Sequence, residues 1–286
     1  MNALKGLPLH TLFPEFTTTY LPSAQIGINL QQKQPISTPT NLLSIEVPDS
    51  IDSDGEPFEE LPDAEVESAT ICAMFANPQR LPGSTASKEN IKTALANNRQ
   101  ILHFTGHATY NYQRPKQSCL ALSGTDRFTL EDITQLSLDS YHLVSLSACE
   151  TAITGNQTID NEYVGLVSGF LSQGVTNVLS TLWTVESVSS ALFMIEFYRQ
   201  PDWHTAPAVA LKRTQMWLRN VTYRELLNWY KQCAGEIEQK NSICASELLD
   251  AATVIEDEPA KINTTRPPYS HPYYWASFII TGKTHT

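Results

Sequence analysis

Short apolar runs alternate along the chain with stretches in which apolar residues recur every three or four positions. The β-branched run at 17–21 and the apolar runs at 42–47, 100–104, 119–122, 142–146, 175–180 and 275–281 predict strands. Helical spacing predicts helices over 63–75, 87–95, 162–173, 186–198 and 206–219, and a short one after Thr129. Strand, helix and strand in this order favour crossover connections and a parallel sheet.

Residues suited to helix ends stand at three of the predicted boundaries. Asp63 and Thr129 are expected to cap the helices that follow them, and Gly174 is expected to end the helix over 162–173. The composition then changes at 223–268, where a helical stretch gives way to an acidic, proline-containing one. We expect this segment to be a helical and acidic insertion near the end of the domain.

The chain of 286 residues is 41% hydrophobic and carries a formal net charge of −11 at pH 7. Such a chain can bury a sizeable α/β core. Its negative charge argues against nucleic acid and membrane surfaces as partners, although it would suit basic protein segments. No apolar run approaches the ~20 residues of a membrane span, and no signal peptide is recognisable, so we expect a cytoplasmic protein.

The five cysteines give no sign of a disulfide framework or a metal site. Their number is odd and no pair has C-x-x-C spacing, which argues against structural disulfides and zinc. The chain has neither a calcium loop nor a glycine-rich phosphate loop. Histidines and carboxylates at metal-ligand spacing are also missing around Cys72, Cys119, Cys233 and Cys244. We therefore expect reduced thiols, no metal and no cofactor.

Two predicted strands run directly into residues that could carry chemistry. The strand at 100–104 leads into TGHA at 105–108, and the strand at 142–146 leads into SACET at 147–151. Ligands bind outside the carboxyl ends of the strands in an open parallel sheet, and neighbouring strands would bring His107 and Cys149 side by side. An imidazole can take the proton of a thiol or stabilise the reactive thiolate. Taken singly, a cysteine or histidine near a strand end is more often a packing residue, and the pattern alone leaves that alternative open.

The neighbours of this pair suggest further roles. The backbone N–H groups of Ala108 and Cys149 could point at a developing oxyanion. The small residues Gly106 and Ala148 would let backbone and substrate approach closely. His103 lies inside the predicted strand, where we expect it to pack or to support the site.

Four more residues are candidates for substrate binding, and each has a structural alternative. Glu150 follows the cysteine directly and could instead brace its loop. Asp160 and Glu162 could present negative charge to a basic P1 side chain of a substrate, or cap the helix that begins nearby. Trp183 could line a cleft or belong to the core.

Four longer motifs match one known family. They are HFTGHA at 103–108, LVSLSACETA at 143–152, EYVGLVSGFLSQGVTNVLSTLWTV at 162–185 and HPYYWASFIITG at 271–282. In them the chain resembles the CHAT family, caspase-like domains often attached to tetratricopeptide repeats. The resemblance spans most of the chain, with the region 223–265 the exception.

This resemblance implies an α/β fold of the caspase-hemoglobinase type in one domain over 1–286, with a mostly parallel sheet flanked by helices on both faces. It also implies a cysteine peptidase that cuts a protein or peptide in signalling or defence, with His107 as the base and Cys149 as the nucleophile. Caspases have glycine directly after the histidine, whereas here Gly106 precedes it and Ala108 follows, as in CHAT domains.

Two features of the resemblance leave alternatives open. The family's usual opening strands and repeat array are not recognisable, so the chain could be a fragment that works with a repeat-containing regulatory partner or domain. One alternative to a peptidase is a catalytically silent caspase-like interaction module. Another is a different thiol acyl-transfer enzyme on an α/β sheet.

Overall fold

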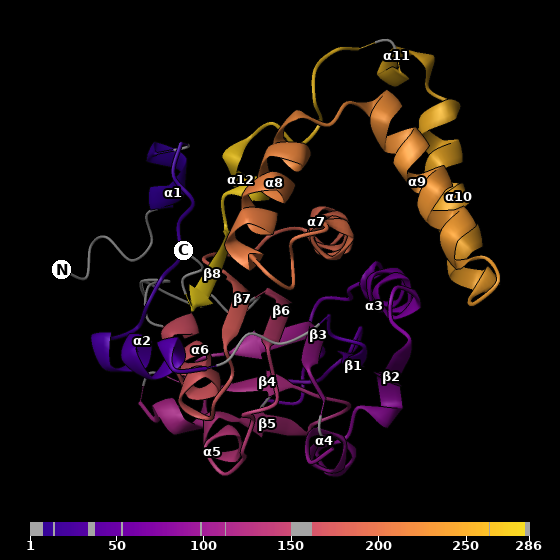
Figure 1. Ribbon diagram of the computed structural model, residues 1–286. Coiled ribbons are helices and arrows are strands. Elements are labelled where there is room, and N and C mark those ends of the chain that lie inside the picture. Colours follow the sequence, from indigo (N-terminus) through magenta and orange to yellow (C-terminus); the bar gives the residue numbers. More distant parts are fainter. Residues whose placement is uncertain are drawn as a thin grey trace.

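A mostly parallel sheet forms the centre of the structure, a computed structural model that describes residues 8–13, 15–33, 38–52, 54–97, 99–111, 113–149, 162–262 and 264–283 (Figure 1). Within these ranges, the side chains of residues 9, 149 and 162–164 are not described. The strand order is β2-β1-β3-β6-β7-β8, with bounds β1 (Asn41–Glu46), β2 (Asn77–Pro82), β3 (Ile101–Thr109), β6 (Leu143–Cys149), β7 (Asn177–Thr181) and β8 (Phe278–Gly282). Neighbouring strands are parallel except β7 and β8, so the predicted mostly parallel sheet is confirmed.

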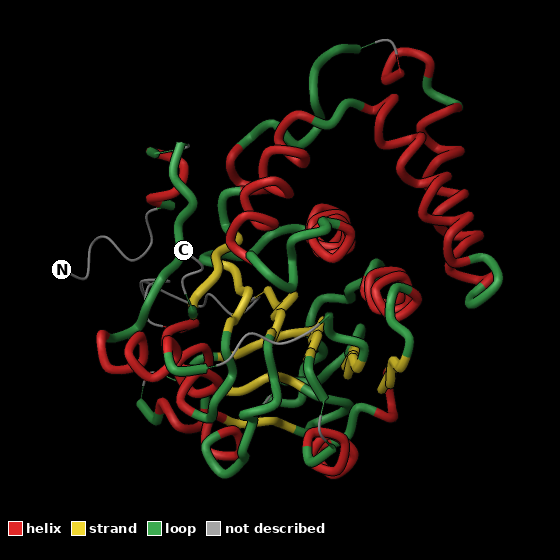
Figure 2. The backbone as a smooth tube through the Cα atoms, in the orientation of Figure 1, coloured by secondary structure: helices red, strands yellow, loops and turns green. Residues whose placement is uncertain are grey.

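Helices cover both faces of this sheet, as Figures 1 and 2 show. One face carries α3 (Ala64–Ala73), α7 (Ser187–Arg199) and α8 (Pro207–Asn220), and the other carries α4 (Lys88–Leu95), α5 (Leu130–Ile133) and α6 (Glu162–Ser172). Side chains of β3 alternate accordingly: Ile101 belongs to the core on the α7 side, whereas Leu102 and Phe104 belong to the opposite core. Burial on both faces explains why the strands read as nearly continuous apolar runs.

β3 and β6 run further than the apolar runs predict. β3 continues to Thr109 and β6 to Cys149, so the residues expected just after the strands lie within them. The parallel register continues through the pair Thr105↔Ser147. Apart from His107, the extra residues are small or β-branched, and pairing with the neighbouring strand outweighs their weak strand pattern.

Two strands are missing from the sequence prediction. β2 carries Pro78 and Pro82, which favour a loop, but it lies at the sheet edge, where proline is tolerated, and pairs with β1 alone. The predicted β4 (Cys119–Ala121) and the unpredicted β5 (Arg127–Thr129) form an antiparallel ladder against the end of β3. Two short 3-10 turns, η2 (Gly83–Thr85) and η3 (Pro115–Gln117), precede α4 and β4.

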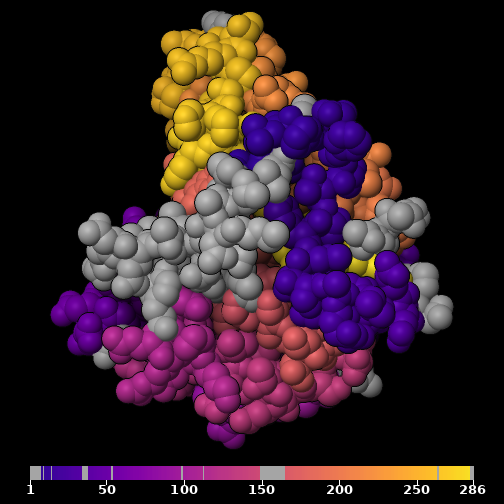
Figure 3. Space-filling view, turned by 90° about the vertical axis from the view of Figure 1, so that its left-hand side faces the viewer, coloured from indigo at the N-terminus to yellow at the C-terminus, as the bar shows by residue number. Residues whose placement is uncertain are grey.

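The predicted strand at 17–21 is wrong. Tyr20 forms an isolated parallel bridge to Thr281, and its N–H donates to the carbonyl of Ile280 at 2.9 Å. One bridge to the rim of β8 replaces the expected ladder, because a helix follows almost at once. The flanking helices are α1 (Leu9–Leu12) and the unpredicted α2 (Ala24–Gln31). This N-terminal segment, indigo in Figure 3, lies on the surface of the molecule.

Two of the three expected helix ends are confirmed. The Thr129 hydroxyl accepts from the backbone N–H of Asp132 at 3.1 Å in a capping box that starts α5. Gly174 has φ +102°, and a Cβ there would stand 2.4 Å from Oδ1 of Asp139, so glycine is required. Asp63 occupies the N-cap position of α3, but its side chain makes no capping hydrogen bond.

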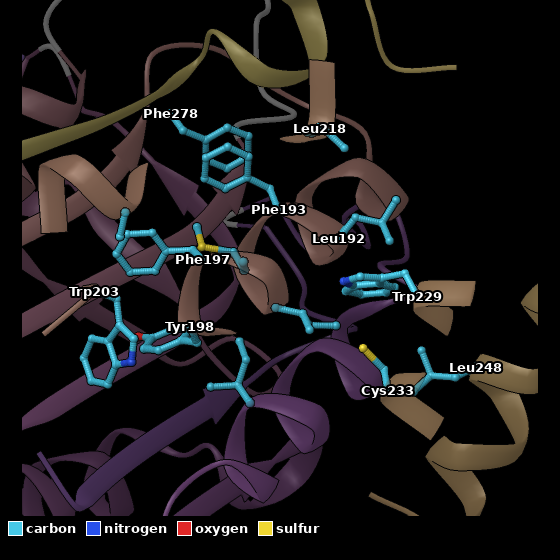
Figure 4. Packing of buried hydrophobic residues seen from close by; sticks show 14 of the residues in the cluster. Leu192, Phe193, Phe197, Tyr198, Trp203, Leu218, Trp229, Cys233, Leu248 and Phe278 are labelled. Carbon is cyan, nitrogen blue, oxygen red and sulfur yellow. The ribbon is translucent and has the colours of Figure 1, made fainter. Parts of the chain in front are cut away.

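The segment at 223–268 consists largely of helices. α9 (Tyr223–Ile237) and α10 (Ser242–Glu256) form a hairpin that projects beside α3 and α7, and α11 (Pro259–Ile262) and α12 (Pro272–Trp275) follow on the way to β8 (Figure 1). The indole N–H of Trp229 on α9 donates to Glu196 on α7 at 2.9 Å. Figure 4 shows Trp229 and Cys233 on the side of the apolar cluster where α9 meets α7. Both helices of the hairpin also contact α3, so the hairpin packs against the domain along α3 and α7.

Candidate active site

His107 and Cys149 stand opposite each other on adjacent strands. They are register partners in the parallel ladder between β3 and β6, and Cys149 is the last residue of β6. The expectation that these two strands are neighbours is confirmed. The backbone of Cys149 belongs to the described residues, whereas its thiol lies outside them.

The imidazole of His107 is fixed on two sides. Its Nε2 lies 2.8 Å from the carbonyl oxygen of Glu59. A carbonyl only accepts, so Nε2 carries the proton, and in the neutral ring Nδ1 is then the basic nitrogen. The Phe58 ring lies against the imidazole with centroids 4.7 Å apart and an interplanar angle of 13°. His107 is completely buried, so this arrangement sets both the tautomer and the plane of the ring.

The loop between β1 and α3 delivers Phe58 and Glu59 to the histidine. The N–H of Phe58 donates to the carbonyl of Ser50 at 2.9 Å, and the Ile51 N–H donates to the carbonyl of Gly124 at 3.1 Å. The residues 48–62 are acidic and contain glycine and prolines, and nothing in that composition predicts this contact. One sequence feature does point to a buried contact in this loop: Phe58 is a lone aromatic residue among acidic residues, glycine and prolines.

The small residues of the two motifs pack inside the molecule. A Cβ on Gly106 would meet Cζ of Phe104 at 2.8 Å, and Ala148 belongs to the core on the α4 and α6 side. The interpretation that these residues make room for substrate is therefore wrong: they face the covering helices of the opposite layer. The backbone of Ala108 pairs with Leu120 of β4, and its role as an oxyanion donor stays a prediction.

The remaining substrate-binding candidates are only partly visible. Glu150 and Asp160 lie outside the described residues, and Glu162 is the first residue of α6 with its side chain outside the description. Trp183 is half-buried, packs against the core on the α7 side, and donates its indole N–H to the carbonyl of Tyr273 at 3.0 Å. That contact favours the packing alternative for Trp183.

Two carboxyls that the sequence analysis did not connect with the site, Asp63 and Glu186, lie at the starts of α3 and α7. The Asp63 N–H donates to the hydroxyl of Ser187 at 3.3 Å, which ties the two helix starts together. Burial raises the pKa of Asp63, and burial together with the charge of Asp63 raises the pKa of Glu186.

Four of the thiols are poor nucleophiles by their surroundings. Burial raises the pKa of Cys72 and Cys244 to about 11 and that of Cys233 to about 12, and it also raises the pKa of Cys119. All four are buried free cysteines. A thiol is reactive as the thiolate, so none of these four suits nucleophilic chemistry at neutral pH.

The described ranges contain no site of three or more histidine, cysteine or acidic side chains that could hold a metal ion. Nor does any helix within them combine the length and apolar character that a membrane crossing requires.

His103 lies buried inside β3, as expected, within a polar cluster that the sequence did not reveal. Its Nε2 is 3.0 Å from Oε1 of Glu67, and its Nδ1 is 2.9 Å from Oγ of Ser145. An acidic residue in a helix usually faces solvent, yet the side chain of Glu67 is buried and only 2% exposed. Burial of a carboxyl against a sheet depends on how α3 is rotated, which a weakly amphipathic sequence does not specify.

A sequence model of the CHAT domain matches residues 1–283. Among curated proteins, a sequence search finds no match.

Of the solved structures, the Arg-specific cysteine proteinase gingipain R is similar with a TM-score of 0.44 and 10% identity, covering 86% of this chain and 46% of that chain. The complex of the RgpB pro- and mature domains from Porphyromonas gingivalis gives a TM-score of 0.41 and 9% identity, covering 86% and 47%. The chain thus spans slightly less than half the length of the gingipain chains that it matches.

Proposed function

This chain belongs to the CHAT domain family, and we propose that it is a caspase-like cysteine endopeptidase in which Cys149 is the nucleophile and His107 its base. The observation that supports this most is the register pair of His107 and Cys149 at the ends of β3 and β6. Paired residues on parallel strands share a face of the sheet, so a thiol at Cys149 would lie beside the imidazole.

The orientation of the imidazole supports the same assignment. With the Nε2 proton directed to the carbonyl of Glu59, Nδ1 is the ring nitrogen that can take the proton of a thiol. Proton transfer from Cys149 to Nδ1 would give a thiolate and an imidazolium, the pair that cysteine peptidases use.

Catalysis would then proceed in two steps. The thiolate attacks the carbonyl carbon of a peptide bond, the C–S bond forms and the C–N bond breaks, and the imidazolium gives its proton to the leaving amine. A water molecule, deprotonated by His107, then attacks the thioester, releases the carboxylic acid and restores the thiol. We propose the N–H groups of Ala108 and Cys149 as donors to the oxyanion in both steps.

We propose that the substrate is a protein segment with a basic residue at P1. The loop that contacts His107 carries exposed acidic side chains, among them Glu59 and Glu60, and the chain has a net charge of −11. Asp160 and Glu162 remain candidates for the same role. Opposite charge around a site draws basic segments toward it. A repeat-containing protein that delivers or withholds this segment is the regulatory partner that we expect.

Labelling by a peptidyl acyloxymethyl ketone tests the assignment. Wild-type protein is expected to be labelled at one site, located by peptide mapping, and Cys149→Ala and His107→Ala are expected to abolish labelling. Cys119→Ala is the matched control, because it removes a buried thiol and should leave labelling intact. Probes with arginine or lysine at P1 should react faster than probes with aspartate.

Labelling that persists in Cys149→Ala would remove Cys149 from the nucleophilic role. Absence of both labelling and peptide cleavage in folded wild-type protein would favour the silent interaction module.

A further inference from the structure

A row of buried polar side chains runs along the sheet face beneath α3 and α7 toward His107. The successive register pairs on this face are His103↔Ser145, Thr105↔Ser147 and His107↔Cys149. Residues two apart on a strand share a face, so the three pairs follow one line across β3 and β6. The described side chains of this row are at most 7% exposed. Buried polar groups cost free energy unless they are hydrogen-bonded, so such a row calls for a physical reason.

Glu67 on α3 joins the first two pairs of the row. Its Oε1 lies 3.0 Å from Nε2 of His103, and its Oε2 accepts a hydrogen bond from the hydroxyl of Ser147 at 3.1 Å. Within the described ranges, no lysine or arginine forms an ion pair with this carboxylate. The described contacts of the Glu67 carboxylate are thus the His103 imidazole and the Ser147 hydroxyl.

Hydrogen bonds hold His103 between Glu67 and α7. The Ser145 hydroxyl lies 2.9 Å from Nδ1 of His103 and 2.6 Å from the hydroxyl of Tyr198 on α7. It also donates to the carbonyl of Leu102 on β3 at 3.5 Å. Burial raises the pKa of Tyr198, so its hydroxyl keeps its proton. These contacts fix the His103 ring, and with it the place of the Glu67 carboxylate above the row.

We propose that Glu67 is a positioning residue of the dyad, whose buried negative charge favours the imidazolium form of His107 and whose bond to Ser147 holds the end of β6. The inference rests on the proposed peptidase function. Two residues along a strand span about 6.4–6.8 Å, so Ser147, which binds the carboxylate, lies that distance from Cys149 along β6. Charges at that separation interact strongly in poorly hydrated protein. The imidazolium is the form that gives a proton to the leaving amine.

The other charged and titratable groups around α3 are neutral or face away from this carboxylate. Arg80 on β2 contacts Glu46 on β1 through Nε at 2.8 Å, and it also pairs with Glu65 at 3.3 Å on the outer side of α3. Glu247 on α10 interacts with Glu65 on that same outer side. Burial raises the pKa of Cys72 to about 11, so its thiol is neutral at neutral pH.

The pH dependence of Cys149 alkylation separates this role from a purely structural one. Iodoacetamide reacts with the thiolate, and peptide mapping reports the rate at Cys149 alone. A nearby negative charge opposes loss of a proton from the thiol–imidazolium pair. Glu67→Gln removes that charge and keeps the shape, so its midpoint should move to lower pH by about half to one pH unit.

Two further variants make the test independent of how well Glu67→Gln folds. Ser147→Ala removes a hydroxyl dipole that partly screens the carboxylate, so its midpoint should move in the opposite direction, to higher pH. Glu196→Gln makes the same change in a buried carboxyl bonded to Trp229, and it should leave the midpoint in place.

An unmoved midpoint in folded Glu67→Gln, or an equal shift in Glu196→Gln, overturns the inference. A wild-type Cys149 that titrates like an ordinary thiol near pH ~8.5 would instead count against the proposed peptidase dyad.

Discussion

The Phe58 ring lies nearly parallel to the His107 imidazole, with centroids 4.7 Å apart and planes inclined by 13°. The two residues are far apart in sequence, and the loop between β1 and α3 brings them together. Together with the carbonyl of Glu59, this contact leaves the imidazole little freedom to rotate. A base that keeps one orientation does not have to be ordered anew in each turnover.

Phe58→Ala should therefore lower the reactivity of Cys149 clearly, while the free energy of unfolding falls only a little. We expect the rate of Cys149 alkylation at neutral pH to fall about 10-fold, because the imidazole gains alternative orientations. The free energy of unfolding should fall by about 1 kcal/mol, the usual size of a stacked aromatic contact. Phe16→Ala is the control, since Phe16 is 63% exposed and remote in sequence from the loop. Equal rates in the two variants would show that the stacking has no part in reactivity.

Gly106→Ala should destabilise the sheet beside His107. The added Cβ would meet the Phe104 ring at 2.8 Å in a packed layer, and such overpacking costs about 1–3 kcal/mol. Urea unfolding measures this loss. Gly235→Ala in α9 provides the comparison, because a Cβ there meets no atom within 4 Å and a helix favours alanine over glycine. If Gly106→Ala is as stable as wild type, the packing account of this glycine fails.

Glu196→Gln should change how stability depends on pH. Burial raises the pKa of Glu196 above its ordinary value of 4.5, although the hydrogen bond from Trp229 and the charge of Arg199 oppose the shift. The folded state then binds the proton more tightly than the unfolded state, so this group's contribution is greatest below pH 4.5 and declines as pH rises through the folded pKa. Glutamine does not titrate, so the stability of wild type relative to Glu196→Gln should decrease between pH 4 and pH 7, on the scale of about 1 kcal/mol. A flat difference would contradict the raised pKa.

Asp132→Asn should show the opposite trend. Burial alone would raise the pKa of Asp132, but hydrogen bonds from Lys88, Lys92 and Thr129 hold it well below its ordinary value of 3.8. The stabilisation is therefore present above pH 3.8 and is lost as pH falls toward the folded pKa. At neutral pH, Asp132→Asn should cost about 1–3 kcal/mol in thermal or urea unfolding, the range of hydrogen bonds to charged groups. The loss should shrink in acid, whereas Glu131→Gln, at the exposed neighbouring residue, should change little at any pH.

Periodicity predicts the centre of the fold well because burial on both faces leaves a clear trace in the sequence. Leu42, Leu143 and Val178 lie in the apolar runs that predict their strands, and the structure places all three in the core. The juxtaposition of β3 and β6 also follows from the motifs at their ends. β2 escapes prediction because its prolines are tolerated only at an edge, and whether a strand lies at an edge is a property of the whole sheet.

The surroundings of the candidate site are less accessible to sequence reasoning. The backbone of Glu59 contacts His107 through its carbonyl, a group that every residue carries, so no side-chain pattern could signal it. Glu67 sits in a helix of low amphipathicity, and an acidic residue there is typical of a solvated face. Both contacts arise from the path of the chain after β1, which depends on long-range packing.

The two edges of the central sheet, β2 and β8, are poor templates for pairing with a strand of another molecule. β2 presents Pro78 and Pro82, which cannot donate backbone hydrogen bonds, and Tyr20 crosses the outer side of β8 through its bridge to Thr281. Neither rim offers an uninterrupted row of donors and acceptors to a strand from another copy. Accidental edge-to-edge assembly and amyloid-like growth are thereby disfavoured, even though the strands between the rims are among the most apolar segments of the chain.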